Sequence, residues 1–256
     1  MQEDISLARG LKLSAGHALY CREDDALAIA DLHLGYEAAL QAEHVSIPRF
    51  QLEPMLERLA WLLERYRPEI LVINGDLKHE FSHNKGQEWD EVDRVLDLLE
   101  NLEAVVVRGN HDNYLQSILA TRGVRMQDSF RLPEGSITFL HGHRKMDANQ
   151  DFIVYGHEHP VIRIRDEVGA QVTLPCFLYD RDNGFIVIPA FSPLASGTNV
   201  LSPESSFMNP AIREMDISEA RVFAIHDGMM DFGRVADLRA LNEEFPPPGM
   251  KAKNTR

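Results

Sequence analysis

The sequence predicts an α/β protein in which two β-sheets pack face to face, with helices on their outer sides. In the first half of the chain, continuous apolar runs of strand length alternate with amphipathic runs of helical spacing. A β-α-β-α-β order of this kind favours parallel strands joined by helical crossovers. The second half holds mostly strand-like runs with few helices between them, so it needs a sheet of its own.

The strands and helices of the first half alternate from residue 26 onward. Residues 26–35 form an apolar strand that ends in polar residues and glycine, and residues 49–68 keep the leucine and methionine spacing of a helix. Residues 69–76 are a continuous apolar run, as in a strand buried on both faces. An amphipathic helix at 89–102 and a third buried strand at 103–112 complete this half.

The second half begins with a short helix at 114–123 and continues with strand-like runs at 136–143, 152–166, 171–180, 184–191 and 220–228. Residues 190–210 are a long loop rich in serine, proline and glycine, which forms either a wall of the active site or a simple connection. We expect a single domain over residues 1–245 and a disordered tail at 246–256, which is Pro-rich and then basic.

Composition limits the possible functions. The 256 residues are 44% hydrophobic, enough for a sizeable core, and no apolar run is long enough to span a membrane. The first residues are acidic and lack the apolar segment of a signal peptide, so we expect a cytoplasmic protein. Two isolated cysteines, Cys21 and Cys176, are then expected to be buried free thiols.

The net charge of −14 excludes a protein that coats nucleic acid electrostatically. It does not exclude a nucleic-acid substrate, because bound divalent cations supply local positive charge that a residue count omits.

Side chains that bind metals follow five of the predicted strands. Open α/β sheets collect their ligands at the carboxyl ends of strands. Asp31 and His33 lie two residues apart, so in an extended chain they would face the same side. The complete set of candidate ligands is Asp31, His33, Asp76, Asn110, His141, His157 and His159.

These two aspartates, one asparagine and four histidines suit a metal that accepts mixed oxygen and nitrogen ligands. The set lacks the cysteines that a closed structural zinc site prefers. Seven ligands exceed the needs of one ion and suit a pair of ions roughly 3.5–4 Å apart, bridged by one carboxylate. We expect two divalent ions, with Mn²⁺ first and Fe, Zn, Co or Mg as alternatives.

The order of the motifs is more specific than their composition. Asp-x-His, Gly-Asp, Gly-Asn-His-Asp, His and Gly-His-x-His follow one another over residues 26–160. This order resembles the calcineurin-like metallophosphoesterases, which implies a four-layer α-β-β-α sandwich of two mixed sheets flanked by helices. "GDLKHEF" resembles a motif of double-strand-break repair nucleases. "PAFSPLASGTNV" resembles a loop of prokaryotic ICC-like phosphoesterases, some of which associate with DNA-repair helicases and ligases.

The resemblance also implies roles for single residues. One metal is held by Asp31, His33 and His159, the other by Asn110, His141 and His157, and Asp76 bridges the two.

Three further residues are implied to take part in catalysis. His111 protonates the leaving alkoxide or stabilises its charge, and Asp112 orients His111. His79 matches the nuclease-type histidine and contacts His111 or the phosphate.

Other polar residues near the motifs have less specific expectations. His143 either holds a ligand ring in place or is a plain loop residue, and Arg144 and Lys145 are positioned to meet substrate phosphates. Glu158 points away from its flanking histidines and is not a ligand. Histidines outside the motifs are expected on the surface or in packing, namely His17, His44, His83 and His226.

The sequence thus predicts a dinuclear metal-dependent phosphoesterase that cleaves phosphodiester bonds by attack of a metal-bound hydroxide. Nucleic acid is the expected substrate, as for a nuclease in DNA repair, with a helicase or ligase as partner. The alternatives are a small-molecule phosphatase or nucleotide phosphodiesterase, and a non-catalytic metal-binding partner protein. The sequence leaves open the physiological substrate, the metal, the mode of cutting and the oligomeric state.

Overall fold

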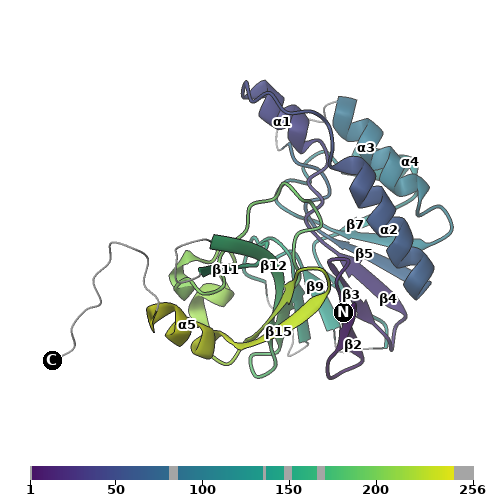
Figure 1. Cartoon of the computed structure of the whole chain (residues 1–256). Coiled ribbons are helices and arrows are strands. Elements are labelled where there is room, and N and C mark those ends of the chain that lie inside the picture. The colour runs from purple at the N-terminus through teal and green to yellow at the C-terminus, as the bar shows by residue number, and fades with distance from the viewer. Residues whose placement is uncertain (1, 81–85, 135–136, 147–151, 166–170, 245–256) are drawn as a thin grey trace.

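The computed structural model describes residues 2–80, 86–134, 137–146, 152–165 and 171–244. Two sheets pack face to face and helices lie on their outer sides, which gives four layers (Figure 1). This confirms the predicted α-β-β-α sandwich of two mixed sheets.

The first sheet has the strand order β1-β2-β3-β4-β5-β6-β7. Strands β1 to β4 pair antiparallel, whereas β4 to β7 pair in parallel, as the alternation of strands and helices predicts. The bounds are β1 (Asp4–Ser6), β2 (Leu11–Ser14), β3 (Ala18–Cys21), β4 (Ala26–Ile29), β5 (Ile70–Asn74), β6 (Glu103–Val107) and β7 (Arg125–Gln127).

Alternate residues of a strand point to opposite faces of the sheet. Both faces of the central strands are apolar, so helices cover one face and the second sheet covers the other. In β4, Leu27 and Ile29 pack among the helices, whereas Ala26 and Ala28 face the second sheet. The helix predicted at 89–102 runs instead from Gly86 to Asp97. The helices on this side are α1 (Tyr36–Ala42), α2 (Leu52–Tyr66), α3 (Gly86–Asp97) and α4 (Gln116–Thr121).

The second sheet has the order β15-β14-β12-β13-β10-β9-β8, and β11 pairs with β12. Only β9, β10 and β13 pair in parallel in the described part of this sheet. The bounds are β8 (Phe130–Arg131), β9 (Ile137–Leu140), β10 (Phe152–Tyr155), β11 (Val161–Arg165), β12 (Gln171–Asp180), β13 (Phe185–Val187), β14 (Arg221–Ile225) and β15 (Met229–Arg234).

The outer side of the second sheet is covered by one helix and two short 3-10 helices: α5 (Val235–Glu244), η1 (Glu204–Ser206) and η2 (Ile212–Glu214). Between the sheets, Val72 of β5 packs in one apolar cluster with Phe139 of β9 and Val154 of β10. Cys21 and Cys176 are buried free thiols, as predicted.

None of the described helices has both the length and the apolar character needed to cross a membrane. The predicted disordered tail at 246–256 lies outside the described residues.

Candidate metal centre

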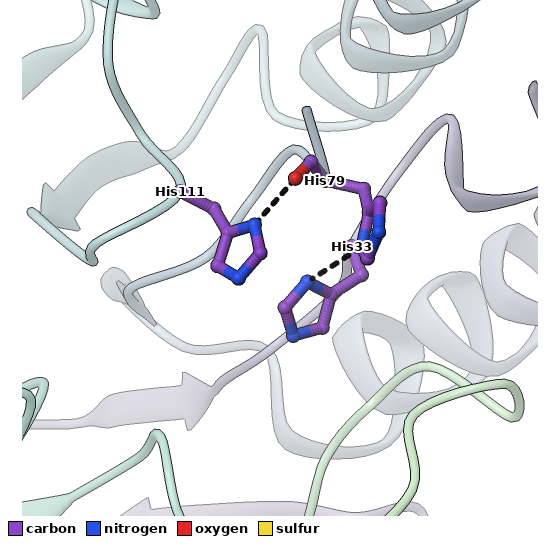
Figure 2. A group of neighbouring side chains, drawn as sticks. All are labelled: His33, His79 and His111. Atoms are coloured by element: carbon purple, nitrogen blue, oxygen red, sulfur yellow. Dashed lines mark hydrogen bonds between the residues drawn. The ribbon is translucent and has the colours of Figure 1, made fainter. Parts of the chain in front are cut away.

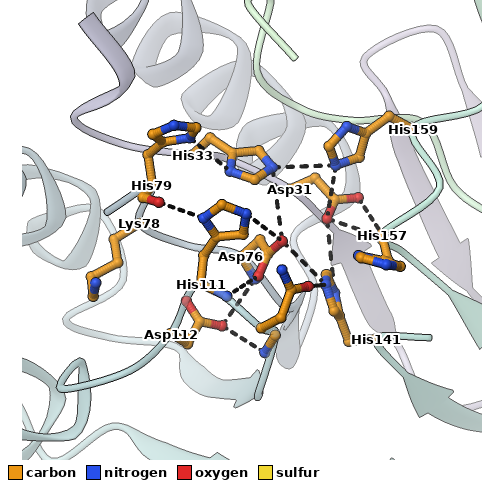
Figure 3. A network of polar contacts seen from close by, with 12 residues as sticks. Asp31, His33, Asp76, Lys78, His79, His111, Asp112, His141, His157 and His159 are labelled. Atoms are coloured by element: carbon orange, nitrogen blue, oxygen red, sulfur yellow. Dashed lines mark hydrogen bonds and ion pairs between the residues drawn. The ribbon is translucent and has the colours of Figure 1, made fainter. Parts of the chain in front are cut away.

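Strands of both sheets end at one edge, and the candidate ligands follow them there (Figure 3 labels all of them except Asn110). In the first sheet, Asp31 comes after β4, Asp76 after β5 and Asn110 after β6. In the second, His141 follows β9 and His157 follows β10. The site therefore lies across the seam between the sheets, and each sheet supplies part of it.

The first group of donors comprises Asp31, His33 and His159, whose ligand atoms all lie within 4.8 Å of one another. The Nε2 atoms of His33 and His159 are 3.2 Å apart, and Asp31 Oδ1 lies 3.4 Å from His159 Nε2. Two atoms at right angles and about 2.1 Å from one ion would be about 3 Å apart. The spacing of these donors therefore suits a single metal ion.

The second group comprises Asp76, His141 and His157. The Nε2 atom of His141 lies 3.2 Å from Asp76 Oδ2 and 3.2 Å from the amide oxygen of Asn110. Asp76 Oδ2 is also 3.9 Å from His33 Nε2, so this carboxylate lies between the two groups. The structure thus brings together all seven predicted ligands in the two groups that the sequence suggested.

Backbone carbonyls set the orientation of two ligand rings. The Nδ1 atom of His141 lies 2.9 Å from the carbonyl oxygen of Asn74, and that of His159 lies 3.0 Å from the carbonyl oxygen of Ser196. A carbonyl oxygen can only accept a hydrogen bond, so each Nδ1 donates and Nε2 is the ring atom available to a metal. This second layer of contacts is typical of metal-binding histidines.

Five of the seven candidates have a left-handed backbone. The φ angles are 58° at Asp31, 46° at His33, 51° at Asp76, 64° at His157 and 46° at His159. Asp31 and His33 therefore do not lie in extended chain, contrary to the prediction from their spacing, because β4 has ended before both. Such a conformation costs about 1–3 kcal/mol per residue and gathers at functional sites.

Glycines make room for the side chains of two candidate ligands, His141 and Asp76. A Cβ on Gly75 would lie 2.1 Å from His141 Nδ1, and one on Gly109 would lie 2.1 Å from Asp76 Oδ1. Any larger residue would push the ring or the carboxylate out of the site, so the glycines beside Asp76 and Asn110 are steric requirements.

The electrostatics of the site favour cations. Burial lowers the pKa of His33 to about 3 and that of His157 to about 4, so both rings are neutral near pH 7. Burial opposes charge on Asp76, but His141 outweighs it and the pKa of Asp76 lies below its ordinary value. Against the effect of burial, Asp76 raises the pKa of His141 to about 9. A metal that binds His141 must therefore displace its proton.

His79 and His111 lie beside His33, a member of the first donor group (Figure 2). The expected contact between them exists, but it is the backbone carbonyl of His79 that accepts a hydrogen bond from His111 Nδ1. The His79 ring instead places its Nδ1 3.3 Å from His33 Nδ1 and stacks on Tyr36, with ring centroids 3.8 Å apart. His79 thus supports a ligand ring through its side chain and His111 through its backbone.

Asp112 does not orient His111 as expected. Its carboxylate accepts backbone N–H bonds from Asp76 at 2.9 Å, Leu77 at 2.9 Å and Gly109 at 2.8 Å. The backbone N–H of His111 donates to Asp76 Oδ1 at 2.9 Å. Asp112 therefore ties together the loops after β5 and β6, and the ring of His111 is oriented by the His79 carbonyl.

The loop at 190–210 forms a wall of the site, which decides between the two sequence alternatives. Besides the contact between Ser196 and His159, the N–H of Ser192 donates to the Asp31 carbonyl at 3.1 Å. Gln51 bridges from the other side, since it donates to the His33 carbonyl and accepts from the Ser192 hydroxyl.

Glu158 is a functional-site residue whose contacts the sequence did not reveal. It lies between two candidate ligands but is fully buried and points to the loop at 190–210. Its two carboxylate oxygens accept the N–H groups of Met208 at 3.0 Å and Asn209 at 2.8 Å. An acidic residue between two candidate ligands indicates a role at the site. The sequence does not show which N–H groups its carboxylate accepts.

The remaining candidates have varied surroundings. The His143 ring lies 5.4 Å from that of His141, between centroids, and its buried Nδ1 has no hydrogen-bond partner within the described residues. Arg144 pairs with Asp128 and Lys145 with Glu214 at the surface.

The histidines outside the motifs fit the prediction of surface or packing positions. His44 and His226 are exposed, and His226 directly follows β14. His17 is half-buried and bonds a backbone carbonyl, and His83 lies outside the described residues.

Comparisons with known proteins show the family and the fold of the chain. A family model described as calcineurin-like phosphoesterase matches residues 26–180, more than half of the chain. The crystal structure of the Pseudomonas putida nuclease MPE has a TM-score of 0.67 at 23% identity, and the match covers 91% of this chain and 100% of that one. YfcE, a phosphoesterase from E. coli, has a TM-score of 0.39 at 20% identity and covers 68% of this chain and 83% of its own. No curated protein matches the sequence.

Proposed function

The chain belongs to the calcineurin-like phosphoesterase family and is a metal-dependent phosphoester hydrolase, and from this premise we propose that it cleaves phosphodiester bonds in nucleic acid. The observation that carries the proposal is the pair of donor groups that share Asp76, with His111 beside them. We assign the seven candidate ligands to two divalent ions, of which Mn²⁺ is the first to test.

The donor set fits such ions, because imidazole nitrogens, an amide oxygen and carboxylates lie close enough together to bind a common ion. Bound divalent ions would supply activated water and neutralise the charge on the phosphate oxygens. The carbonyls of Asn74 and Ser196 hold the rings of His141 and His159 so that their Nε2 atoms face this position.

His111 is the candidate proton donor for the leaving oxygen. Its Nδ1 is engaged with the His79 carbonyl, and its Nε2 lies 3.9 Å from Asp76 Oδ2, on the side of the donor groups. As an imidazolium, His111 carries a second proton on Nε2 and can transfer it to the departing alkoxide. His79 positions both His111 and His33, and Asp112 braces the loops that carry Asp76 and Asn110.

Two observations support nucleic acid as the substrate. The segment "GDLKHEF" resembles the motif of repair nucleases, and its histidine touches both a ligand ring and His111. A protein of the same fold, from Pseudomonas putida, is a nuclease.

The test compares wild type with His111→Ala in Mn²⁺, on single-stranded, duplex and branched DNA and RNA and on aryl phosphoesters. We expect cleavage of nucleic acid to fall about 10²- to 10⁴-fold, because an alkoxide leaves poorly without a proton. An aryl phosphodiester should lose less, since an aryloxide needs no proton. His226→Ala, an exposed histidine outside the site, is the control and should keep wild-type rates.

Full activity of His111→Ala on DNA and RNA would remove His111 from the mechanism. Hydrolysis of aryl phosphomonoesters alone by the wild type would show a phosphatase instead of a nuclease.

A further inference from the structure

Two arginines that lie close in sequence to candidate ligands share one carboxylate. Arg108 lies two residues before Asn110, and Arg144 lies three residues after His141. Arg144 Nη2 is 2.9 Å from Asp128 Oδ1, and Arg108 Nε is 3.9 Å from the same oxygen. Both arginines are therefore close in sequence to ligands proposed for the second metal, Asn110 and His141.

The backbone keeps this arrangement in place. Strands β6 and β7 pair in parallel up to Val107 and Gln127, and the N–H of Arg108 donates to the Gln127 carbonyl at 2.7 Å. Arg108 and Asp128 thus leave neighbouring strand ends side by side. Their side chains are 44% and 54% exposed, and that of Arg144 is 49% exposed, so a ligand can reach all three.

The arginines outnumber the carboxylate in this group. Two guanidinium groups on one carboxylate leave an excess of one positive charge, on a chain with a net charge of −14. Arg122 shows the opposite balance, with three carboxylate partners, Asp93, Asp97 and Glu100. Lys145 is paired one to one with Glu214.

Guanidinium groups suit phosphate because their planar N–H donors match two phosphate oxygens and are weakly hydrated. An exposed ion pair contributes little to stability, so Asp128 can give way to a phosphate at little cost.

We propose that Arg108 and Arg144 bind a second phosphate of the substrate, next to the phosphodiester that is cleaved. Arg108 and Asn110 are two residues apart, so their Cα atoms are at most about 7 Å apart, within reach of neighbouring phosphates on one strand. The inference rests on the proposed function and sharpens it, because a second phosphate site favours a polynucleotide over a mononucleotide.

The experiment uses Arg108→Gln, Arg144→Gln and the double variant, each loaded with Mn²⁺. Substrates are a single-stranded oligonucleotide, which offers several phosphates, and an aryl phosphodiester, which offers one. The matched control is Arg221→Gln, whose side chain is 47% exposed and pairs with Asp231. Its strand, β14, is separated from β10 by β12 and β13.

For the double variant, we expect kcat/KM on the oligonucleotide to fall about tenfold more than on the aryl phosphodiester, mostly through KM. The slope of log KM against log salt should flatten by about 0.7 for each phosphate that the variant no longer neutralises, which a purely structural defect would not produce. The control should match wild type in both respects.

Equal losses on both substrates, or an unchanged salt dependence, would overturn the arginine site and leave the proposed function intact. Wild type that cleaves the aryl phosphodiester but no oligonucleotide would overturn nucleic acid as the substrate. Binding of a labelled oligonucleotide, followed by fluorescence anisotropy, then decides the arginine site, which falls if the double variant binds as tightly as wild type.

Discussion

At the residue scale, Glu158 shows how an acid that is no ligand can still control a metal site. Its position between His157 and His159 means that any movement of its backbone moves two candidate ligands. Its carboxylate fastens that segment to Met208 and Asn209 through two hydrogen bonds. Since the flanking histidines have a left-handed backbone, the segment depends on such external hydrogen bonds to keep its shape.

We predict that Glu158→Gln weakens Mn²⁺ binding about tenfold, the range found when residues that support metal ligands are replaced. The amide places an N–H where a backbone N–H already points, so one of the two hydrogen bonds is replaced by a repulsion. Titration calorimetry measures the affinity, and circular dichroism verifies the fold.

The control is Glu204→Gln, which removes the same charge but lies in the loop at 190–210 and pairs with Arg239. If Glu158→Gln binds Mn²⁺ as tightly as this control, Glu158 does not position the ligands.

The types of the site residues were predictable from the sequence, but their contacts were not. All seven candidate ligands follow apolar strands, and the order of the motifs reveals the set. The Nδ1 atoms of His141 and His159 bond the backbone carbonyls of Asn74 and Ser196. Any residue type could supply such a carbonyl, so the sequence does not reveal these partners. Asp112 was misjudged for the same reason, because its three partners are backbone N–H groups.

At the element scale, the buried parallel strands β4, β5 and β6 were predictable because a central strand between two layers is apolar on both faces. The antiparallel strands β1, β2 and β3 have three or four residues each, with polar residues interleaved, and gave no comparable signal. These strands matter for the site, because the turn between β2 and β3 carries His17, whose Nδ1 lies 2.8 Å from the carbonyl oxygen of Ala190.

The burial of His17 should make stability depend on pH. Burial, with a further contribution from Arg58, lowers the pKa of His17 to about 3, whereas an unfolded histidine titrates near 6.5. Between these values the unfolded state binds a proton that the folded state excludes. The stabilising contribution of neutral His17 is therefore present above about pH 6.5 and is lost as the pH falls toward 3.

We expect His17→Gln to reduce the loss of unfolding free energy between pH 7 and pH 5, because glutamine does not titrate and its amide N–H can still donate to Ala190. Urea denaturation at both pH values measures this, with His44→Gln, an exposed histidine, as control. The same pH dependence in His17→Gln and wild type would show that His17 titrates normally.

At the scale of the whole molecule, the two sheets meet twice: in the apolar layer between them and at the metal centre. Asp31, Asp76 and Asn110 belong to the first sheet, whereas His141 and His157 belong to the second. A β-α-β pattern predicts the first sheet, and the apolar runs predict a second, but their relative placement depends on packing between distant residues. The order of the motifs indicates how the two sheets are placed. Ligands of one metal site have to lie close together, so the strand ends that carry them have to meet.

Metal binding should therefore stabilise the whole fold and not only the loops. An ion held by both sheets cannot stay bound once they separate, so its binding free energy adds to the free energy of unfolding. It also offsets the strain of the left-handed ligands and the proximity of Asp31 to Asp76. At a free Mn²⁺ concentration 100 times the Kd, one site contributes about 2.7 kcal/mol. For a chain of this size that corresponds to a rise in Tm of roughly 5–11 °C.

Differential scanning calorimetry of protein treated with chelator, with and without added Mn²⁺, measures this shift. Asp76→Asn should lose most of it, because the carboxylate between the two donor groups becomes a neutral amide with one oxygen. Arg221→Gln, far from the site, should keep it in full. A shift confined to hydrogen exchange in the loops, with Tm unchanged, would mean that the ions are held by one sheet alone and that the seam between the sheets opens independently of them.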